Sequence, residues 1–226
     1  MKPVRAIPIQ TLSVGGKFSS RKNSRIVSYE SQLELAFLYH LEFSPDVKAY
    51  VEQPCKVPSP SGRHYVPDFL VFFNEPLRRP LLVEVKYSSE IRKNSDKLLT
   101  KFETLEKYAL KKGYDFKVFT EKDLLTPRLK NYKFLYNYLD KPLPENLYAT
   151  YVENVINFVR EKQPVRVIDV AKILGKGEFI PTGFYLSTVW HLIATGKLQT
   201  NLDEELTNLT YVYLKKDAKR GLPCPL

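Results

Sequence analysis

The chain has 226 residues, and its 35 lysine and arginine residues outnumber its 25 acidic residues by ten. This length suits one large domain or two modest ones, and the excess of positive charge favours an anionic partner, most often nucleic acid. Hydrophobic residues make up 43% of the chain, which excludes a disordered protein. No run approaches the ~20 apolar residues that a membrane-spanning helix needs, and residues 1–25 hold no long apolar stretch of the secretory type. We therefore expect a cytoplasmic protein that does not enter a membrane.

The positive charge is unevenly distributed along the chain. Residues 1–140 carry a net charge of +8, whereas residues 141–226 carry only +2. The first 25 residues contain six basic residues and no acidic one. This composition predicts a flexible or extended basic arm, which either contacts phosphates or is simply solvated. A second basic group is spaced to lie along one helix and consists of Arg92, Lys93, Lys97 and Lys101.

Hydrophobic periodicity predicts alternating helices and strands in the first 140 residues. Ser28 is the expected N-cap of the first helix, which should end near Phe43 because Pro45 disfavours its continuation. The remaining expected elements are strands at Val47–Gln53, Tyr65–Phe73 and Leu81–Tyr87, a helix at Asp96–Lys112, a strand at Tyr114–Thr120 and a short helix at Asn131–Leu139. We expect an α/β fold, in which a mixed sheet is flanked by helices.

A second domain is expected after the proline-rich segment at residues 141–144. Three helical patterns follow at about 145–161, 166–174 and 184–195, and residues 199–214 have the pattern of a small hairpin. Three helices followed by a two-stranded wing are typical of a winged helix-turn-helix. The sequence therefore predicts a domain at 1–140 and a winged-helix domain at 141–226.

Three charged residues lie in two strongly apolar strands of the first domain. Asp68 follows Pro67, and Glu84 and Lys86 belong to the next strand. Side chains alternate along a strand, and an antiparallel pairing centred on residue 77 sets Asp68 opposite Lys86, at roughly 5 Å between Cβ atoms, with Glu84 at about 7 Å. Buried charges need partners or a metal. Mg²⁺ suits such a group, since it accepts one or two carboxylates and activates a bound water. A cross-strand salt bridge without catalysis is the alternative.

The order of these elements resembles the PD-(D/E)xK restriction-endonuclease-like nucleases, and more closely the TnsA family, the endonuclease subunits of heteromeric cut-and-paste transposases. The spacing of 18 residues from Asp68 to Lys86 is also similar to that family. The similarity spans residues 31–86, and the pattern after residue 141 is similar to the family's C-terminal domain. The matching stretches are Ser31–Phe37, Leu41–Val47, Glu52–Pro54, Pro67–Val71 and Val83–Lys86.

The resemblance implies a role for each candidate residue. Asp68 would be the central metal ligand, Glu84 a second ligand and Lys86 the catalytic lysine. Glu34 would be the active-site glutamate of the first helix and a third metal ligand. Glu30, one turn earlier on the expected helix, is the alternative helix carboxylate. The cofactor would be Mg²⁺, for which Mn²⁺ could substitute.

The resemblance also implies a reaction and partners. The protein would cut the non-transferred 5′ strands of double-stranded DNA at transposon ends, while a DDE transposase, TnsB, would process the 3′ ends and an AAA+ ATPase, TnsC, would regulate both. The nearly neutral C-terminal domain would then dock a protein rather than DNA. A stand-alone restriction or repair nuclease of the same fold, and a catalytically inert DNA-binding regulatory protein, are the alternatives.

Overall fold

The computed structural model describes residues 3, 15–59 and 62–214. The chain divides into two compact units between Leu125 and Thr126. This division lies earlier than residue 140, where the proline-rich segment placed it, because helix α5 (Pro127–Tyr136) packs with the second unit. On that helix, the Asn131 side chain donates to the carbonyl oxygens of Leu202 and Glu204 at 2.8 and 2.7 Å.

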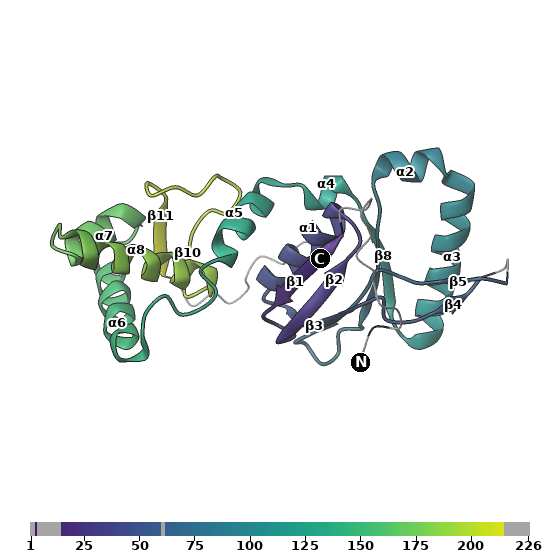
Figure 1. Ribbon diagram of the computed structural model, residues 1–226, viewed down its shortest axis with the longest axis horizontal. Coiled ribbons are helices and arrows are strands. Elements are labelled where there is room, and N and C mark those ends of the chain that lie inside the picture. Colours follow the sequence, from purple (N-terminus) through teal and green to yellow (C-terminus); the bar gives the residue numbers. More distant parts are fainter. Residues whose placement is uncertain (1–2, 4–14, 60–61, 215–226) are drawn as a thin grey trace. The chain divides into compact units, whose positions relative to one another are not determined.

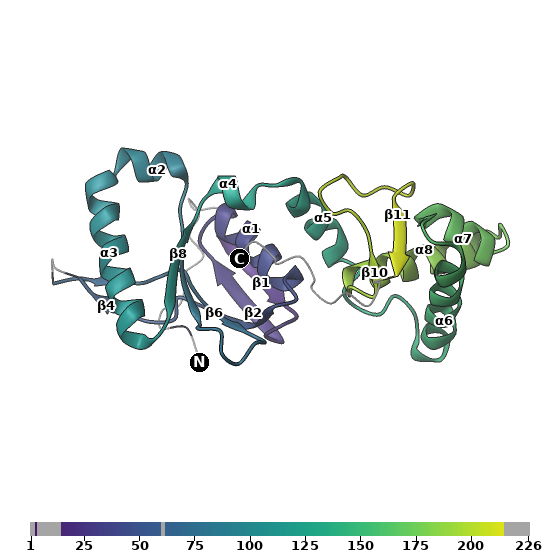
Figure 2. The same cartoon turned by 180° about the vertical axis from the view of Figure 1, so that it is seen from behind.

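A four-stranded mixed sheet forms the centre of the first unit. Its strand order is β3-β6-β7-β8, with β7 antiparallel to β6 and parallel to β8. Helix α1 lies on one side of the sheet and helix α3 on the other (Figures 1 and 2). This layout confirms the expected α/β fold with a mixed sheet. The bounds are β3 Val47–Glu52, β6 Phe69–Phe73, β7 Leu81–Val85, β8 Asp115–Phe119, α1 Gln32–Phe43 and α3 Ser95–Lys112.

Both faces of this sheet are covered by apolar side chains. On the α1 face, the ring of Phe37 packs against Phe69 and Phe119, with ring centroids 5.2 and 5.0 Å apart. The α3 face holds a second cluster, whose buried members are Val57, Leu70, Leu82, Leu105 and Ala109. A sheet covered on both faces explains why its strands are nearly continuous apolar runs. It also means that any charge on these strands is buried.

Helix α1 starts later than the sequence predicts. Ser31 is the N-cap, and its hydroxyl oxygen accepts a hydrogen bond from the backbone N–H of Glu34 at 3.1 Å. The expectation that Ser28 caps the helix is wrong, because Ser28 lies in strand β2 (Arg25–Tyr29). The predicted end near Phe43 is confirmed.

Residues 16–29 form an antiparallel hairpin rather than a flexible or extended arm. Strand β1 (Gly16–Ser20) pairs with β2, and Phe18 opposite Val27 buries an apolar pair beneath the hairpin. The expectation of an arm is therefore wrong for this segment, whereas residues 4–14 lie outside the described residues. The sequence signal for these strands was an apolar residue at the centre of each, Phe18 in the first and Val27 in the second.

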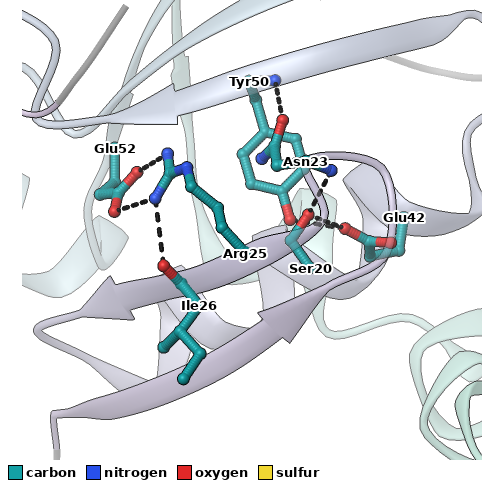
Figure 3. A network of polar contacts seen from close by, with 7 residues as sticks. All are labelled: Ser20, Asn23, Arg25, Ile26, Glu42, Tyr50 and Glu52. Carbon is teal, nitrogen blue, oxygen red and sulfur yellow. Dashed lines mark hydrogen bonds and ion pairs between the residues drawn. The ribbon is translucent and has the colours of Figure 1, made fainter.

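Glu42, near the end of α1, attaches this hairpin to the core of the first unit (Figure 3). Its carboxylate accepts hydrogen bonds from the hydroxyl groups of Ser20 and Tyr50 at 2.7 and 2.6 Å, and from the backbone N–H groups of Arg21 and Lys22 at 3.1 and 3.2 Å. A buried carboxylate with four donors is well compensated for its loss of water. The hairpin is thus a built part of the first unit.

The Arg25 guanidinium adds a second attachment of the hairpin. It forms two hydrogen bonds with the Glu52 carboxylate on β3, at 2.7 and 2.5 Å (Figure 3). Glu52 is only 5% exposed. Bidentate ion pairs of this kind are among the stronger ion pairs in proteins.

Shorter elements connect the main ones. Gly113, with a φ of 73°, ends α3 in the left-handed conformation that glycine favours, as the sequence predicts. The connecting elements are β4 Val57–Pro58, β5 His64–Tyr65, α2 Ser88–Lys93 and α4 Glu121–Leu124.

The second unit consists of helices and a small antiparallel sheet of strand order β10-β11-β9. The three predicted helices and the hairpin are confirmed, although the last helix begins at Phe179 rather than near residue 184. The elements are α6 Glu145–Lys162, β9 Val165–Arg166, α7 Val167–Leu174, α8 Phe179–Ala194, β10 Leu198–Gln199 and β11 Tyr211–Leu214. Across the described part of both units, no helix combines the length and apolar character needed to cross a membrane.

Replacing Glu42 with alanine should loosen the hairpin. The substitution leaves the buried Ser20 and Tyr50 hydroxyl groups without their acceptor, so we expect a loss of about 3 kcal/mol of unfolding free energy. Amide hydrogen exchange should accelerate in residues 16–29, and the melting temperature should fall by about 6–12 °C. Glu106→Ala, at an exposed position of α3, is the matched control and should leave both measurements unchanged. Equal exchange in the two variants would contradict this role of Glu42.

Candidate active site

Asp68, Glu84 and Lys86 converge at adjacent ends of β6 and β7. Asp68 directly precedes β6, Glu84 lies within β7, and Lys86 directly follows β7. The Lys86 ammonium lies 4.0 Å from Oδ2 of Asp68 and 3.4 Å from Oε1 of Glu84. Glu84 is fully buried, whereas the side chains of Asp68 and Lys86 keep 15% and 22% exposure. The group is therefore open to a ligand on the Asp68–Lys86 side.

The pairing of β6 and β7 differs from the expected one by two residues. Phe69 pairs with Val83 and Leu70 with Leu82, so the loop is centred on residue 76. The connection contains a turn in which the Arg78 N–H donates to the Glu75 carbonyl. This turn begins soon after the end of β6 at Phe73, so more of the connecting residues lie between the turn and the start of β7 at Leu81. The expectation that Asp68 lies opposite Lys86 is wrong, yet the residues still share a face because a slip of two preserves the side-chain alternation.

Asp68 is held rigidly by the strands on either side. Its backbone N–H donates to the Val83 carbonyl at 3.0 Å, and its own carbonyl accepts from the Gln53 N–H at 2.8 Å. The Val85 N–H donates to Oδ2 of the Asp68 carboxylate at 2.7 Å. Backbone and side chain are thus fixed together, which is the preorganisation that a reactive centre requires.

Glu34 lies in the first turn of α1, and both of its carboxylate oxygens have partners. The Ser31 hydroxyl donates to Oε1 at 3.0 Å, and the Glu30 N–H donates to Oε2 at 2.8 Å. Burial and the negative charge of Asp68 raise the pKa of Glu34 to about 7, so its carboxyl interacts electrostatically with the Asp68 group. Glu30 precedes the helix, and the expectation that it lies one helical turn before Glu34 is therefore wrong.

Lys101, on α3, also belongs to this group. Its ammonium forms an ion pair with Oε1 of Glu84, and its side chain is only 16% exposed. The sequence assigned Lys101 to a basic surface of the helix. A signal for its inward orientation was present, because Leu98 and Leu105, the buried residues of the same helical stripe, flank it at spacings of three and four.

The carboxyl groups hold more negative charge than burial tolerates. Burial and the Asp68 charge raise the pKa of Glu84 to about 7, against the opposing effects of Lys101 and Lys86. Burial likewise raises the pKa of Asp68, although Lys86, Lys101 and the Val85 N–H all oppose it. Burial disfavours the charge on Lys86, but Asp68 and Glu84 outweigh it and raise its pKa. Near neutral pH, a further cation close to these carboxyl groups would therefore stabilise their ionised form.

The residues present fit a divalent metal ion. Oε2 of Glu84 is buried and has no hydrogen-bond partner among the residues that the structure describes, so it is available to coordinate a cation. Within the described ranges, no three His, Cys, Asp or Glu side chains are grouped so as to hold a metal by themselves. Mg²⁺ matches this arrangement, because it is commonly held by one or two carboxylates and completes its coordination with water and phosphate oxygens.

A mixed sheet with acidic and basic side chains at the ends of two central strands fits the restriction-endonuclease-like class of nucleases. Two family models match the chain. The model described as TnsA-like endonuclease N terminal matches residues 44–121, and the model described as TnsA endonuclease C terminal matches residues 123–202. Together they cover more than two thirds of the chain, which belongs to the TnsA endonuclease family. A search of curated proteins found no match.

The N-terminal family model includes some of the candidate residues and not others. Asp68, Glu84 and Lys86 lie within the part that the N-terminal model matches, whereas Glu34 precedes it. The family assignment implies a nuclease that works with DNA and with other transposition proteins. The resemblance seen in the sequence is thereby confirmed.

The metal-free protein should lose stability as the pH rises. Because the folded-state pKa of Glu84 is about 7 and an unfolded glutamate titrates near ~4.3, the native state binds more protons between these values. The free energy of unfolding therefore falls across this range. We expect Glu84→Gln to match the wild type near pH 5 in EDTA, and to exceed its melting temperature by roughly 5 °C at pH 8.

Mg²⁺ should remove much of this difference at pH 8, since it offsets the charge of the wild-type site. Glu106→Gln serves as the control, because Glu106 is exposed on the same helix as Lys101. Parallel melting curves for the wild type and Glu84→Gln from pH 5 to 8 would show that Glu84 does not titrate in this range.

Proposed function

We propose that this protein is a Mg²⁺-dependent endonuclease that cuts the non-transferred 5′ strands of DNA at transposon ends. One observation carries the proposal: Asp68, Glu84 and Lys86 converge at one edge of a buried sheet in a chain of the TnsA endonuclease family. In the described part of the chain, Glu84 is fully buried and one of its oxygens has no partner. A salt bridge alone does not account for this oxygen, whereas a bound cation would.

Each side chain has a distinct role in the proposed reaction. Asp68 and Glu84 would hold the metal ion, whereas Glu34, whose two oxygens already accept hydrogen bonds, would add negative charge nearby without being grouped with them as a ligand. Mn²⁺ could replace Mg²⁺ as another ion that binds oxygen ligands. When bound, the ion polarises the phosphodiester and lowers the pKa of a water molecule. Lys86 stays protonated because of its acidic neighbours, so it orients the attacking water or offsets charge on the phosphorus.

The surroundings of the site support a DNA substrate. Arg92 and Lys93 are exposed on α2, which follows Lys86 directly. Lys17 and Arg21 are exposed on the hairpin of the same unit. Exposed basic side chains in the same unit as an acidic centre attract a polyanion that the carboxylates alone would repel.

We further propose that the second unit is a winged helix that docks a protein. The order α6–β9–α7–α8–β10–β11 is that of a winged helix-turn-helix. Helix α8, which would be its recognition helix, contains no lysine or arginine. Phe179 and Ile180 at its start are 92% and 65% exposed, and Ile173 at the end of α7 is 58% exposed. Exposed apolar side chains of this kind favour a protein partner, and the family points to the ATPase TnsC, which acts with the transposase TnsB.

Asp68→Asn should abolish cleavage while preserving the fold. The amide keeps the shape of the side chain but weakens its hold on the metal, and we expect a loss of at least about 100-fold, with a similar loss for Lys86→Met. The assay is nicking of end-labelled transposon-end DNA, followed separately on each strand, in the presence of TnsB, TnsC and Mg²⁺. Glu106→Gln is the control variant.

The same assay separates the alternatives. Unchanged cleavage by the system with Asp68→Asn would support an inert scaffold and contradict the nuclease. Cutting of a fixed recognition sequence by the wild type alone would indicate a stand-alone nuclease.

Phe179→Asp should weaken binding to TnsC and leave the first unit intact. A charge at a 92% exposed position costs little stability but disrupts an apolar contact, so we expect at least about a tenfold rise in the dissociation constant. Binding is measured by calorimetry with the full-length protein, and Leu77→Asp, equally exposed in the first unit, is the matched control. Equal affinity of both variants for TnsC, with weakened DNA binding by Phe179→Asp alone, would identify this surface as a DNA contact instead.

A further inference from the structure

Two lysines approach the same oxygen atom of Glu84. Lys101 of α3 is in contact with Oε1 of Glu84, and Lys86 lies 3.4 Å from that same oxygen. The other oxygen, Oε2, is buried and has no hydrogen-bond partner within residues 3, 15–59 and 62–214. In this part of the chain, both ion pairs of Glu84 involve the same oxygen of the carboxylate.

The position of Lys101 on α3 makes its contact with Glu84 a fixed part of the fold. Leu98 and Leu105, on the same stripe of the helix, are 8% and 0% exposed, and Leu105 packs against Leu70 and Leu82 of the sheet. The helix therefore cannot rotate to bring Lys101 to the surface without exposing these leucines. Lys101 comes from outside the strand pair, so it reaches Glu84 from the helix layer above the sheet.

We propose that Lys101 is a positioning residue that frees Lys86 for the reaction. This inference rests on the proposed function. Lys101 acts as the permanent counter-ion of Glu84, so that Glu84 does not require the ammonium of Lys86. By holding Oε1, it also leaves Oε2 as the oxygen that is available to a metal ion.

The argument follows from the cost of a buried charge. A fully buried carboxylate needs a cation close by, and Lys86 is the nearest substitute at 3.4 Å. Without Lys101, Lys86 would close this gap and become the only counter-ion of Glu84. An ammonium held in a buried ion pair is withdrawn from the water or phosphate that it serves in catalysis.

Three variants test the proposal: Lys101→Met, Lys101→Arg and the double variant Glu84→Gln/Lys101→Met. Methionine removes the charge but fills a similar volume. The double variant also removes the charge that would capture Lys86. Because Glu84 is itself a proposed metal ligand, the double variant is used to follow Lys86 in the metal-free protein and not to measure cleavage. Cleavage is measured in single turnovers with saturating DNA and Mg²⁺, and DNA affinity is measured separately over a range of salt concentrations.

We expect Lys101→Met to slow cleavage by about 10- to 100-fold with the DNA dissociation constant unchanged. Lys101→Arg should restore most of the rate. If Lys101 contacted DNA instead, affinity would fall and the salt slope would decrease by about one. That result would overturn the proposal.

A second measurement does not depend on cleavage. The rate at which acetic anhydride acetylates Lys86 in the metal-free protein, followed by mass spectrometry, reports whether its ammonium is held in an ion pair. It should fall at least severalfold in Lys101→Met and recover in the double variant. Unchanged acetylation would overturn the inference even if the nuclease is active. Conversely, a wild type that never cuts DNA would refute the proposed function, while the acetylation rates would still decide the role of Lys101.

Discussion

The buried carboxylate of Glu84 is the constraint on which the site depends. It is fully buried in the central sheet, where an ionised group is costly unless cations surround it. Lys86, directly after the same strand, and Lys101 from α3 supply these cations. The pKa of Glu84 nevertheless stays near 7, because burial and, to a smaller extent, the negative charge of Asp68 oppose its ionisation. Two lysines are therefore insufficient to ionise every carboxyl group. The remaining imbalance is the physical basis of the proposed metal binding.

A site with this imbalance requires a rigid frame, since relaxed carboxylates would move apart or turn to solvent. Hydrogen bonds from Gln53 and Val85 fix the Asp68 backbone and carboxylate. Gln53 has a φ of +44°, an unfavourable conformation for a residue other than glycine. Such strain persists only where the surrounding structure enforces it, and it is typical of functional sites. The Arg25–Glu52 ion pair immediately before Gln53 supplies that support from the hairpin.

The sequence predicts this site well where only side-chain alternation matters. A period of two places Asp68, Glu84 and Lys86 on one face whichever even register the strands adopt, so the wrong pairing did not change the grouping. Contacts that depend on the packing of separate elements were not predictable in the same way. Lys101 resembled a surface lysine because its helix also carries exposed lysines, and only the position of α3 on the sheet shows its contact with Glu84. The hairpin was not predicted because its strands are only five residues long and lie in a segment rich in basic residues, serine and glycine, which is typical of a flexible arm.

The structure also changes the meaning of the net charge of +10. A formal charge counts basic residues without regard to where they point. Three residues of the two basic groups that the sequence singled out make contacts within the protein itself. Lys22 donates to two backbone carbonyl groups at 2.7 and 2.6 Å, Arg25 pairs with Glu52, and Lys101 pairs with Glu84. These ion pairs leave the net charge unchanged, because the acidic partners are already subtracted from it, but they leave fewer basic side chains to contact phosphates directly. Because phosphate contacts supply most non-specific affinity, this smaller number of available contacts favours a nuclease that partner proteins bring to its DNA over one that binds DNA tightly by itself.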